Sequence, residues 1–168
     1  GKTCDYCRNG GALDKNTCPR CKTVWACSDI HITLYEGEIL GIVGESGSGK
    51  STLMKSLYFD FDITEGKGYL RDFENGEADI FEQSLQRKKY IKNHIMGMVY
   101  QNPLLGLRMD YSGAGNIAEK LIAAAQRNFA GMNDRVEELL DAVEILQSRK
   151  KEPPKNFSGG MQQRVQIS

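Results

Sequence analysis

Apolar and polar residues alternate along part of the chain in a way that predicts β-strands. In "IHITLYEGEILGIVG", residues 30–44, the alternation is followed by an unbroken apolar run. Alternation is typical of a half-buried strand, and a short apolar run is typical of a buried one. We therefore expect strands over 30–34 and 39–43, joined by a turn at Glu36-Gly37. The apolar run "IMGMVYQ", residues 95–101, predicts another buried strand.

Other stretches repeat their apolar residues every three to four positions, which predicts helices. "KSTLMKSLYF", residues 50–59, is the first, and the Ala-rich segment 116–127 is the second. A further helix is expected to begin near Asn133, a good N-cap residue. Its apolar positions are Val136, Leu139, Leu140 and Val143. The C-terminal "FSGGMQQRVQIS" predicts a glycine turn that leads into another helix.

Length and charge limit the functional classes. The chain has 168 residues, enough for one domain with a core. Lys plus Arg and Asp plus Glu number 22 each, so no cationic field favours a nucleic-acid partner. No apolar run approaches the roughly 20 residues that span a bilayer, and no signal peptide is evident. The chain begins with Gly1 and stops inside an apolar-periodic stretch, so we expect a piece of a longer cytoplasmic protein.

The segment "GESGSGKS", Gly44–Ser51, matches the phosphate-binding pattern G-x-x-x-x-G-K-[ST] at every fixed position. It lies between a predicted strand and a predicted helix, which disfavours the alternative of a chance Gly/Ser linker. Glycines let backbone N–H groups turn inward around an anion, and the helix adds its positive N-terminus. Lys50 supplies a charge for the β- and γ-phosphates, and the Ser51 hydroxyl can ligate Mg²⁺. The predicted nucleotide-binding residues are Gly44, Glu45, Ser46, Gly47, Ser48, Gly49, Lys50, Ser51 and Thr52.

Two later features suggest that two chains share the nucleotide. Gln101 ends the predicted strand over 95–101. "NFSGGMQQR", residues 156–164, is a Ser-Gly-Gly turn that opens a helix, a second phosphate-binding end. Two chains arranged head to tail would each need such an end for the other's γ-phosphate.

In this order the motifs resemble the nucleotide-binding domain of ABC ATPases over residues 22–168. The resemblance implies an α/β fold: a P-loop NTPase of ABC type with an antiparallel β-subdomain, a RecA-like core and a helical signature subdomain. It also implies ATP and Mg²⁺ as cofactors, with Lys50, Ser51 and Thr52 holding them and a second ABC subunit as partner. Gln101 takes the catalytic role of contacting Mg²⁺ and the attacking water. The signature residues, expected at the other subunit's ATP, are Ser158, Gly159, Gly160, Met161 and Gln162.

Some parts of the family pattern differ or are not found. Phe157 and Met161 stand where the family usually has Leu and often has Gln, but the Ser-Gly-Gly backbone carries the phosphate contact. The family's Walker B aspartate, catalytic glutamate and switch histidine lie beyond the signature. We therefore expect a truncated domain that binds ATP without hydrolysing it efficiently, although the full-length family member is an ATPase. The adenine-stacking aromatic is not assigned; Trp25, Tyr6 or a residue before Gly1 could serve.

The stretch "YQNPLLGLRMDYSGAGNIAEKL", residues 100–121, narrows the resemblance. It is similar to the ATP-binding subunit of the phosphonate carbon–phosphorus lyase system, which implies ATP use coupled to phosphonate utilisation and a lyase core as partner. An oligopeptide, dipeptide or nickel importer ATPase stays open, with a membrane permease as partner and a place at the inner face of the membrane. A zinc-containing DNA-repair ABC ATPase is the alternative of another class. Met161, where those proteins usually have Glu, and the neutral charge argue against it.

The N-terminal cysteines form two CxxC pairs. Cys4, Cys7, Cys18 and Cys21 have the spacing of a tetrahedral Cys₄ zinc site. The alternatives are two disulfides, which are rare in the cytosol, and chance, which seldom places four cysteines as two CxxC pairs. Cys27, the fifth cysteine, is expected to be a small buried apolar residue and not a metal ligand. We expect a zinc-ribbon-like insertion over 1–24, structural or used for docking, followed by a partial ABC domain over 25–168. The P-loop, built from its own strand and helix, is expected to bind phosphate without the ribbon.

Overall fold

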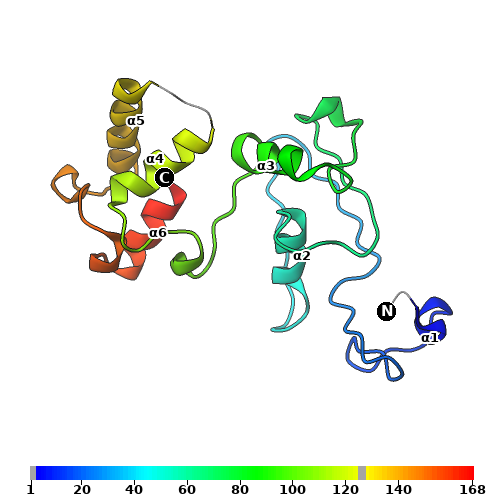
Figure 1. Ribbon diagram of the computed structural model, residues 1–168. Coiled ribbons are helices and arrows are strands. Elements are labelled where there is room, and N and C mark those ends of the chain that lie inside the picture. The colour runs from blue at the N-terminus through cyan, green and yellow to red at the C-terminus, as the bar shows by residue number, and fades with distance from the viewer. Residues whose placement is uncertain (1–2, 125–127) are drawn as a thin grey trace. The chain divides into compact units, whose positions relative to one another are not determined.

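The structure, a computed structural model, describes residues 3–124 and 128–168. It divides the chain into two compact units, Gly1–Gly66 and Lys67–Ser168. Figure 1 shows that the helices carry nearly all of the regular structure in both units. None of the described helices has the length and apolar character that a bilayer span requires.

The first unit contains two helices, α1 (Asp5–Arg8) and α2 (Lys50–Leu57). Helix α2 confirms the helix expected after the glycine-rich loop. Gly49 precedes it in the left-handed region with φ of +94°, a conformation that glycine adopts without a steric penalty. After its last turn, Tyr58 is buried and donates its backbone N–H to the carbonyl of Met54. The helix is therefore fixed at both ends.

The expected strands over 30–34 and 39–43 do not form in this structure, and this expectation was wrong. The pairing found among the described residues consists of isolated bridges, from Thr17 to Asp14 and to Val24. A strand satisfies its backbone N–H and C=O groups by pairing with a neighbour. No described segment pairs with 39–43, and its outermost side chains are almost fully exposed, Ile39 at 97% and Val43 at 93%.

Two smaller expectations in this region have different outcomes. The turn at Glu36-Gly37 is present, because the N–H of Glu38 donates to the carbonyl of Tyr35 at 3.0 Å. The strand expected over 95–101 is absent, and this segment has no regular structure. The apolar pattern predicted a strand in each case, but a strand forms only when a partner segment is adjacent.

The second unit is built around three helices: α4 (Gly113–Ala123), α5 (Phe129–Ala142) and α6 (Gly159–Ile167). Helix α4 packs against both others (Figure 1). The buried core joins the three helices with the loops between α5 and α6. Its members are Ile117, Val136, Leu140, Ile145, Phe157 and Val165. Short 3₁₀ turns connect the helices: Pro103–Leu105, Gln147–Arg149 and Pro154–Asn156.

The observed starts of these helices correct the expected boundaries. Helix α4 begins three residues before the expected segment 116–127, because Ser112 caps it by accepting from the N–H of Gly115. Residues 125–127 of that expected helix lie outside the described residues. Helix α5 begins after Asn128, whose Oδ1 accepts from the N–H of Gly131 at 3.3 Å. Asn133 was wrongly expected as the cap: it lies inside the helix, and its side chain donates to Glu137 at 3.1 Å.

Helix α3 (Leu85–His94) has no counterpart in the sequence-based expectation. Ser84 caps it by accepting from the N–H of Arg87 at 3.4 Å. Its apolar content is low, with Ile91 as its buried residue, so hydrophobic periodicity gave no signal. Just before this helix, the 3₁₀ turn Glu74–Gly76 completes the regular structure of the second unit.

Candidate functional site: a phosphate-binding loop and a cysteine cluster

The glycine-rich loop has the backbone geometry of an anion cradle. Gly47 and Gly49 have φ of +83° and +94°, values that side-chain-bearing residues rarely adopt. A turn inside the loop is closed by the N–H of Ser48, which donates to the carbonyl of Glu45 at 3.2 Å. The loop leads directly into α2, whose free N–H groups form a positive end. The two glycines singled out from the sequence therefore have the conformations that the chemistry requires.

Lys50 folds back over this loop. Its Nζ donates to the carbonyl of Gly44 at 2.7 Å and to that of Glu45 at 2.6 Å, and it lies 3.2 Å from Oγ of Ser48. The ammonium is therefore held where an anion in the loop would meet it. Ser51 follows in the first turn of α2 with its side chain exposed. A cation and a hydroxyl thus flank one cradle, which suits a phosphate–Mg²⁺ pair.

The segment just after the cysteine-rich region packs against this loop. A Cβ built on Gly49 would lie 2.2 Å from the carbonyl oxygen of Ala26 and 3.1 Å from Sγ of Cys27. No side chain fits there, so Gly49 is required by close packing as well as by its backbone angle. Sγ of Cys27 also donates to the carbonyl of Gly49 at 3.5 Å. Cys27 is half-buried, and it lies on an irregular segment, since no strand forms here.

The four cysteines of the two CxxC pairs come together. The sulfur atoms of Cys4, Cys7, Cys18 and Cys21 all lie within 4.8 Å of one another. A tetrahedral zinc with Zn–S bonds of about 2.3 Å places its sulfurs about 3.8 Å apart. Sγ of Cys7 and Sγ of Cys21 are already 3.6 Å apart, and all four residues are free thiols. The donor set therefore fits a soft divalent ion with four thiolates and no open position.

The protonation of the cluster also favours a cation. The hydroxyl of Thr23, 3.2 Å from Sγ of Cys21, lowers the pKa of that thiol to about 5. The backbone N–H of Cys21 lowers the pKa of Cys18 in the same way. Removal from water, together with the neighbouring thiols, raises the pKa of Cys7 to about 12. Four adjacent thiols cannot all ionise without an opposing charge, and a metal ion supplies that charge.

The indole of Trp25 faces the thiol of Cys7. Its Nε1–H is buried and has no hydrogen-bond partner among the described residues. The indole acts on Cys7 in the direction that lowers the pKa of its thiol. A thiolate ligand at Cys7 would accept this orphaned N–H, as outer-shell donors do around metal sites. Tyr6, the other aromatic considered for adenine stacking, donates its hydroxyl to Ala12 at 2.9 Å and has Arg20 over its ring.

The predicted signature forms the start of α6 in the second unit. Ser158 caps the helix, with its Oγ accepting from the N–H of Met161 at 3.3 Å. A Cβ built on Gly159 or Gly160 would meet no atom within 4 Å, so this helix end is open to a ligand. Phe157, which replaces the usual Leu, is buried in the helical core and anchors the turn.

Two of the predicted signature residues make contacts inside their own unit. Nε2 of Gln162 donates to the carbonyls of Pro154 and Phe157 at 2.9 and 3.3 Å. Sδ of Met161 lies 3.4 Å from a guanidinium nitrogen of Arg149. Both side chains thus hold the turn before α6, and their contact with ATP stays a prediction.

Gln101 is exposed and lies in the second unit, whereas the P-loop lies in the first. The residue before it is tied to the signature helix. With its amide turned to match donors to acceptors, Gln166 pairs with the N–H and the carbonyl of Tyr100 at 2.8 and 3.0 Å. Gly106 makes this pairing possible, because a Cβ there would lie 2.2 Å from the side-chain amide of Gln166. No pattern in the sequence indicated this contact, since Gln166 lies in a stretch that predicted only a helix.

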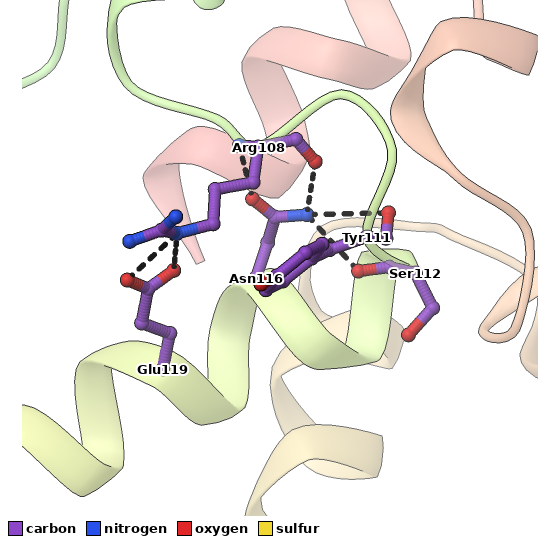
Figure 2. Close-up of polar contacts among 5 residues, drawn as sticks. All are labelled: Arg108, Tyr111, Ser112, Asn116 and Glu119. Carbon is purple, nitrogen blue, oxygen red and sulfur yellow. Dashed lines mark hydrogen bonds and ion pairs between the residues drawn. The ribbon is translucent and has the colours of Figure 1, made fainter.

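The segment after Gln101 is organised by a buried asparagine, as Figure 2 shows. Oδ1 of Asn116 accepts from the N–H of Arg108 at 2.7 Å, and its Nδ2 donates to the carbonyls of Arg108 and Ser112 at 3.1 and 3.0 Å. The guanidinium of Arg108 in turn binds the carboxylate of Glu119 at 2.7 Å and lowers the pKa of that carboxyl. Sequence reasoning quoted these residues as part of a motif but did not foresee that they bind one another.

This chain is similar to known proteins in sequence and in fold. The family model described as ABC transporter matches residues 27–168. The phosphonates utilization ATP-binding protein PhnK of Escherichia coli K12 is 40% identical over 141 residues, which is 84% of this chain and 54% of PhnK. The oligopeptide transport ATP-binding protein OppF of Bacillus subtilis is 36% identical over 87% of this chain and 47% of OppF.

Solved structures agree with the family match. The ATP-binding cassette MJ0796, as a dimer in a post-hydrolysis state with ADP and Pi, has a TM-score of 0.73 and 27% identity. The match covers 84% of this chain and 59% of that one, and it shows the ABC-type P-loop NTPase fold. The chain spans about half the length of the curated relatives that it matches. It belongs to the ABC transporter family.

Proposed function

We propose that this chain is the nucleotide-binding part of an ABC ATP-binding subunit that couples ATP binding and hydrolysis to phosphonate utilisation. The network around Asn116 carries the phosphonate assignment. Arg108, Asn116 and Glu119 belong to the motif on which the resemblance to lyase-system subunits rests, and Arg108 binds both of the others directly. The motif is thus one structural element that shapes the segment after Gln101. The 40% identity to PhnK supports the same assignment.

The residues divide the work on ATP between two subunits. Lys50 and the N–H groups of the P-loop hold the β- and γ-phosphates, while Ser51 and Gln101 ligate Mg²⁺. The ion supplies charge neutralisation on the phosphate oxygens. The open N-terminus of α6 behind Ser158 serves the ATP of the second subunit, in a head-to-tail dimer. The dimeric assembly of MJ0796 with ADP and Pi supports this arrangement.

We further propose that residues 1–24 form an insertion with a structural zinc and that 25–168 form the partial ABC domain. Cys4, Cys7, Cys18 and Cys21 supply four thiolates, so the metal is closed to water and takes no part in hydrolysis. Purified under reducing conditions, the chain should contain about one zinc. Cys18→Ser should lose it and the matched variant Cys27→Ser should keep it, as measured by mass spectrometry of bound metals. Equal zinc content in both variants would contradict the site.

The phosphonate assignment can be tested in the organism that carries the gene. Deletion should abolish growth on methylphosphonate as sole phosphorus source and leave growth on inorganic phosphate unchanged. The intact gene should restore growth, and a gene carrying Lys50→Ala should not. Affinity purification from cells grown on methylphosphonate should recover subunits of a carbon–phosphorus lyase core.

An oligopeptide-type importer ATPase is the second candidate, favoured by the 36% identity to OppF. In that case the partner is a membrane permease and the subunit lies at the inner face of the membrane. Deletion would then leave growth on methylphosphonate intact and abolish uptake of peptides. This result would replace the phosphonate assignment without affecting the ATP site.

A further inference from the structure

The cysteine cluster and the P-loop are joined by a very short stretch of chain. Cys21 is a predicted metal ligand, and five residues later Ala26 lies against Gly49 of the loop. Both features belong to the same compact unit. A stretch this short cannot absorb a rearrangement at one end without moving the other.

The stretch is fixed at its cluster end by contacts that depend on the cluster. The N–H of Trp25 donates to the carbonyl of Asn16 at 2.7 Å, and Val24 forms an isolated bridge with Thr17. The N–H of Cys18 donates to the carbonyl of Thr23 at 2.9 Å. These contacts tie 22–25 to the second CxxC knuckle. About 20 polar residues cannot bury a core of their own, so their geometry depends on the metal.

At its other end the stretch packs against the P-loop through Ala26 and Cys27. The carbonyl of Ala26 occupies the space where a side chain on Gly49 would be, and Sγ of Cys27 donates to the Gly49 carbonyl. Gly49 is the residue that turns the loop into α2, and Lys50 follows it. A shift of Ala26 therefore changes the space available to Gly49. The backbone of Gly49 in turn sets the position of Lys50 and of the N–H groups at the start of α2.

We propose that the metal-loaded cysteine cluster braces the P-loop through residues 22–27, so that nucleotide affinity depends on zinc. This inference rests on the proposed ATP binding and goes beyond it. It also differs from the expectation that the cradle binds phosphate independently of the ribbon. That expectation assumed that the loop is supported by its own strand, but 39–43 is unpaired and exposed among the described residues.

The first experiment compares nucleotide binding with and without metal. A fluorescent ATP analogue with Mg²⁺ is titrated into the chain as purified, after a high-affinity zinc chelator in the presence of reductant, and after Zn²⁺ is restored. We expect the Kd to rise about tenfold on zinc removal and to return on restoration. The rate of amide hydrogen exchange at 44–52 should also rise on zinc removal. The helical circular-dichroism signal, which comes largely from the helices of the second unit, should stay unchanged.

A second variant separates bracing from general unfolding. Two glycines inserted between Trp25 and Ala26 leave all four cysteines and the P-loop sequence intact but lengthen the link. This variant should still bind one zinc, yet its Kd should match that of the zinc-free chain and no longer respond to the metal. The same insertion between Glu36 and Gly37, in an exposed turn, is the matched control and should keep the zinc response.

The outcomes distinguish this inference from the proposals on which it rests, which are the ATP site and the zinc site. An unchanged Kd after zinc removal, or a zinc response that survives the Trp25–Ala26 insertion, would overturn the brace and leave ATP binding in place. Failure of the zinc-loaded chain to bind nucleotide would instead refute the ATP site itself. A chain that binds no zinc would refute both the zinc site and the brace that depends on it.

Discussion

At the residue scale, the P-loop shows how a few atoms fix a binding site. Gly47 and Gly49 have positive φ, the conformation with which successive backbone N–H groups can form an anion-binding nest. Lys50 places its ammonium over the same loop at 2.6–2.7 Å from two carbonyls. A phosphate, which carries a full negative charge, can replace those neutral carbonyls as the partner of the ammonium. The identity of residue 50 should therefore matter more to affinity than any other side chain of the loop.

Lys50→Ala should weaken binding of ATP with Mg²⁺ tenfold or more, about 1.4 kcal/mol, because the charge facing the phosphates is lost. Lys55→Ala is the matched control: Lys55 lies in the same helix but faces the ring of Phe61. Titration of a fluorescent ATP analogue measures both, with zinc content as a check on folding. Equal Kd values for wild type and Lys50→Ala would refute the P-loop assignment.

At the element scale, the ends of the helices are set by capping side chains, which the periodicity of hydrophobic residues does not reveal. Ser84, Ser112, Asn128 and Ser158 each accept from a backbone N–H in the first turn of the following helix. The sequence contains several other candidates for this role, and which one is used depends on where the helix packs. Hydrophobic spacing located α5, but it placed the start five residues too late, at Asn133 instead of Asn128.

The cap assignment gives a direct test on α5. Asn128→Ala should lower the free energy of unfolding of the second unit by about 1 kcal/mol, because the N–H of Gly131 loses its partner. Asn133→Ala is the matched control, since it removes only an exposed hydrogen bond with Glu137, and its effect should be well below that of Asn128→Ala. Urea denaturation followed by helical circular dichroism measures both. The reverse order would place the start of α5 at Asn133.

At the scale of the whole molecule, binding and turnover depend on different parts. These 168 residues contain a P-loop, Gln101 and the predicted signature, and the family resemblance implies that the Walker B carboxylate follows the signature, so we expect it to lie outside them. Without that carboxylate, neither Mg²⁺ nor the attacking water is fully held. ATP should therefore bind without efficient hydrolysis.

Phosphate release from ATP by the 168-residue chain should remain at the background rate, even at concentrations that saturate the site. A chain extended to the length of its relatives should show turnover, and Lys50→Ala should abolish it. A fast rate from the 168 residues alone would show that their catalytic carboxylate has been overlooked. Coupled detection of released phosphate measures all three proteins.

How well the sequence predicted each feature depends on how far apart in the chain its interacting residues lie. The P-loop and α2 followed from local rules, because glycine conformations and a helix start depend on neighbours in the chain. The cysteine cluster was also predicted from spacing alone, and the structure brings its four sulfurs together. The strands over 30–34, 39–43 and 95–101 were wrong because a strand needs a partner elsewhere, and no described segment provides one.

By itself the sequence determined the family and the four-sulfur cluster and predicted the phosphate-binding loop, since each depends on residue type and short spacing. Only the tertiary structure showed that Ala26 lies against Gly49, that Gln166 pairs with Tyr100, and that Asn116 binds Arg108. These contacts join residues whose separation in the chain follows no period. They arise because a folded chain must satisfy buried polar groups and fill space with whatever residue is near, which no local pattern records.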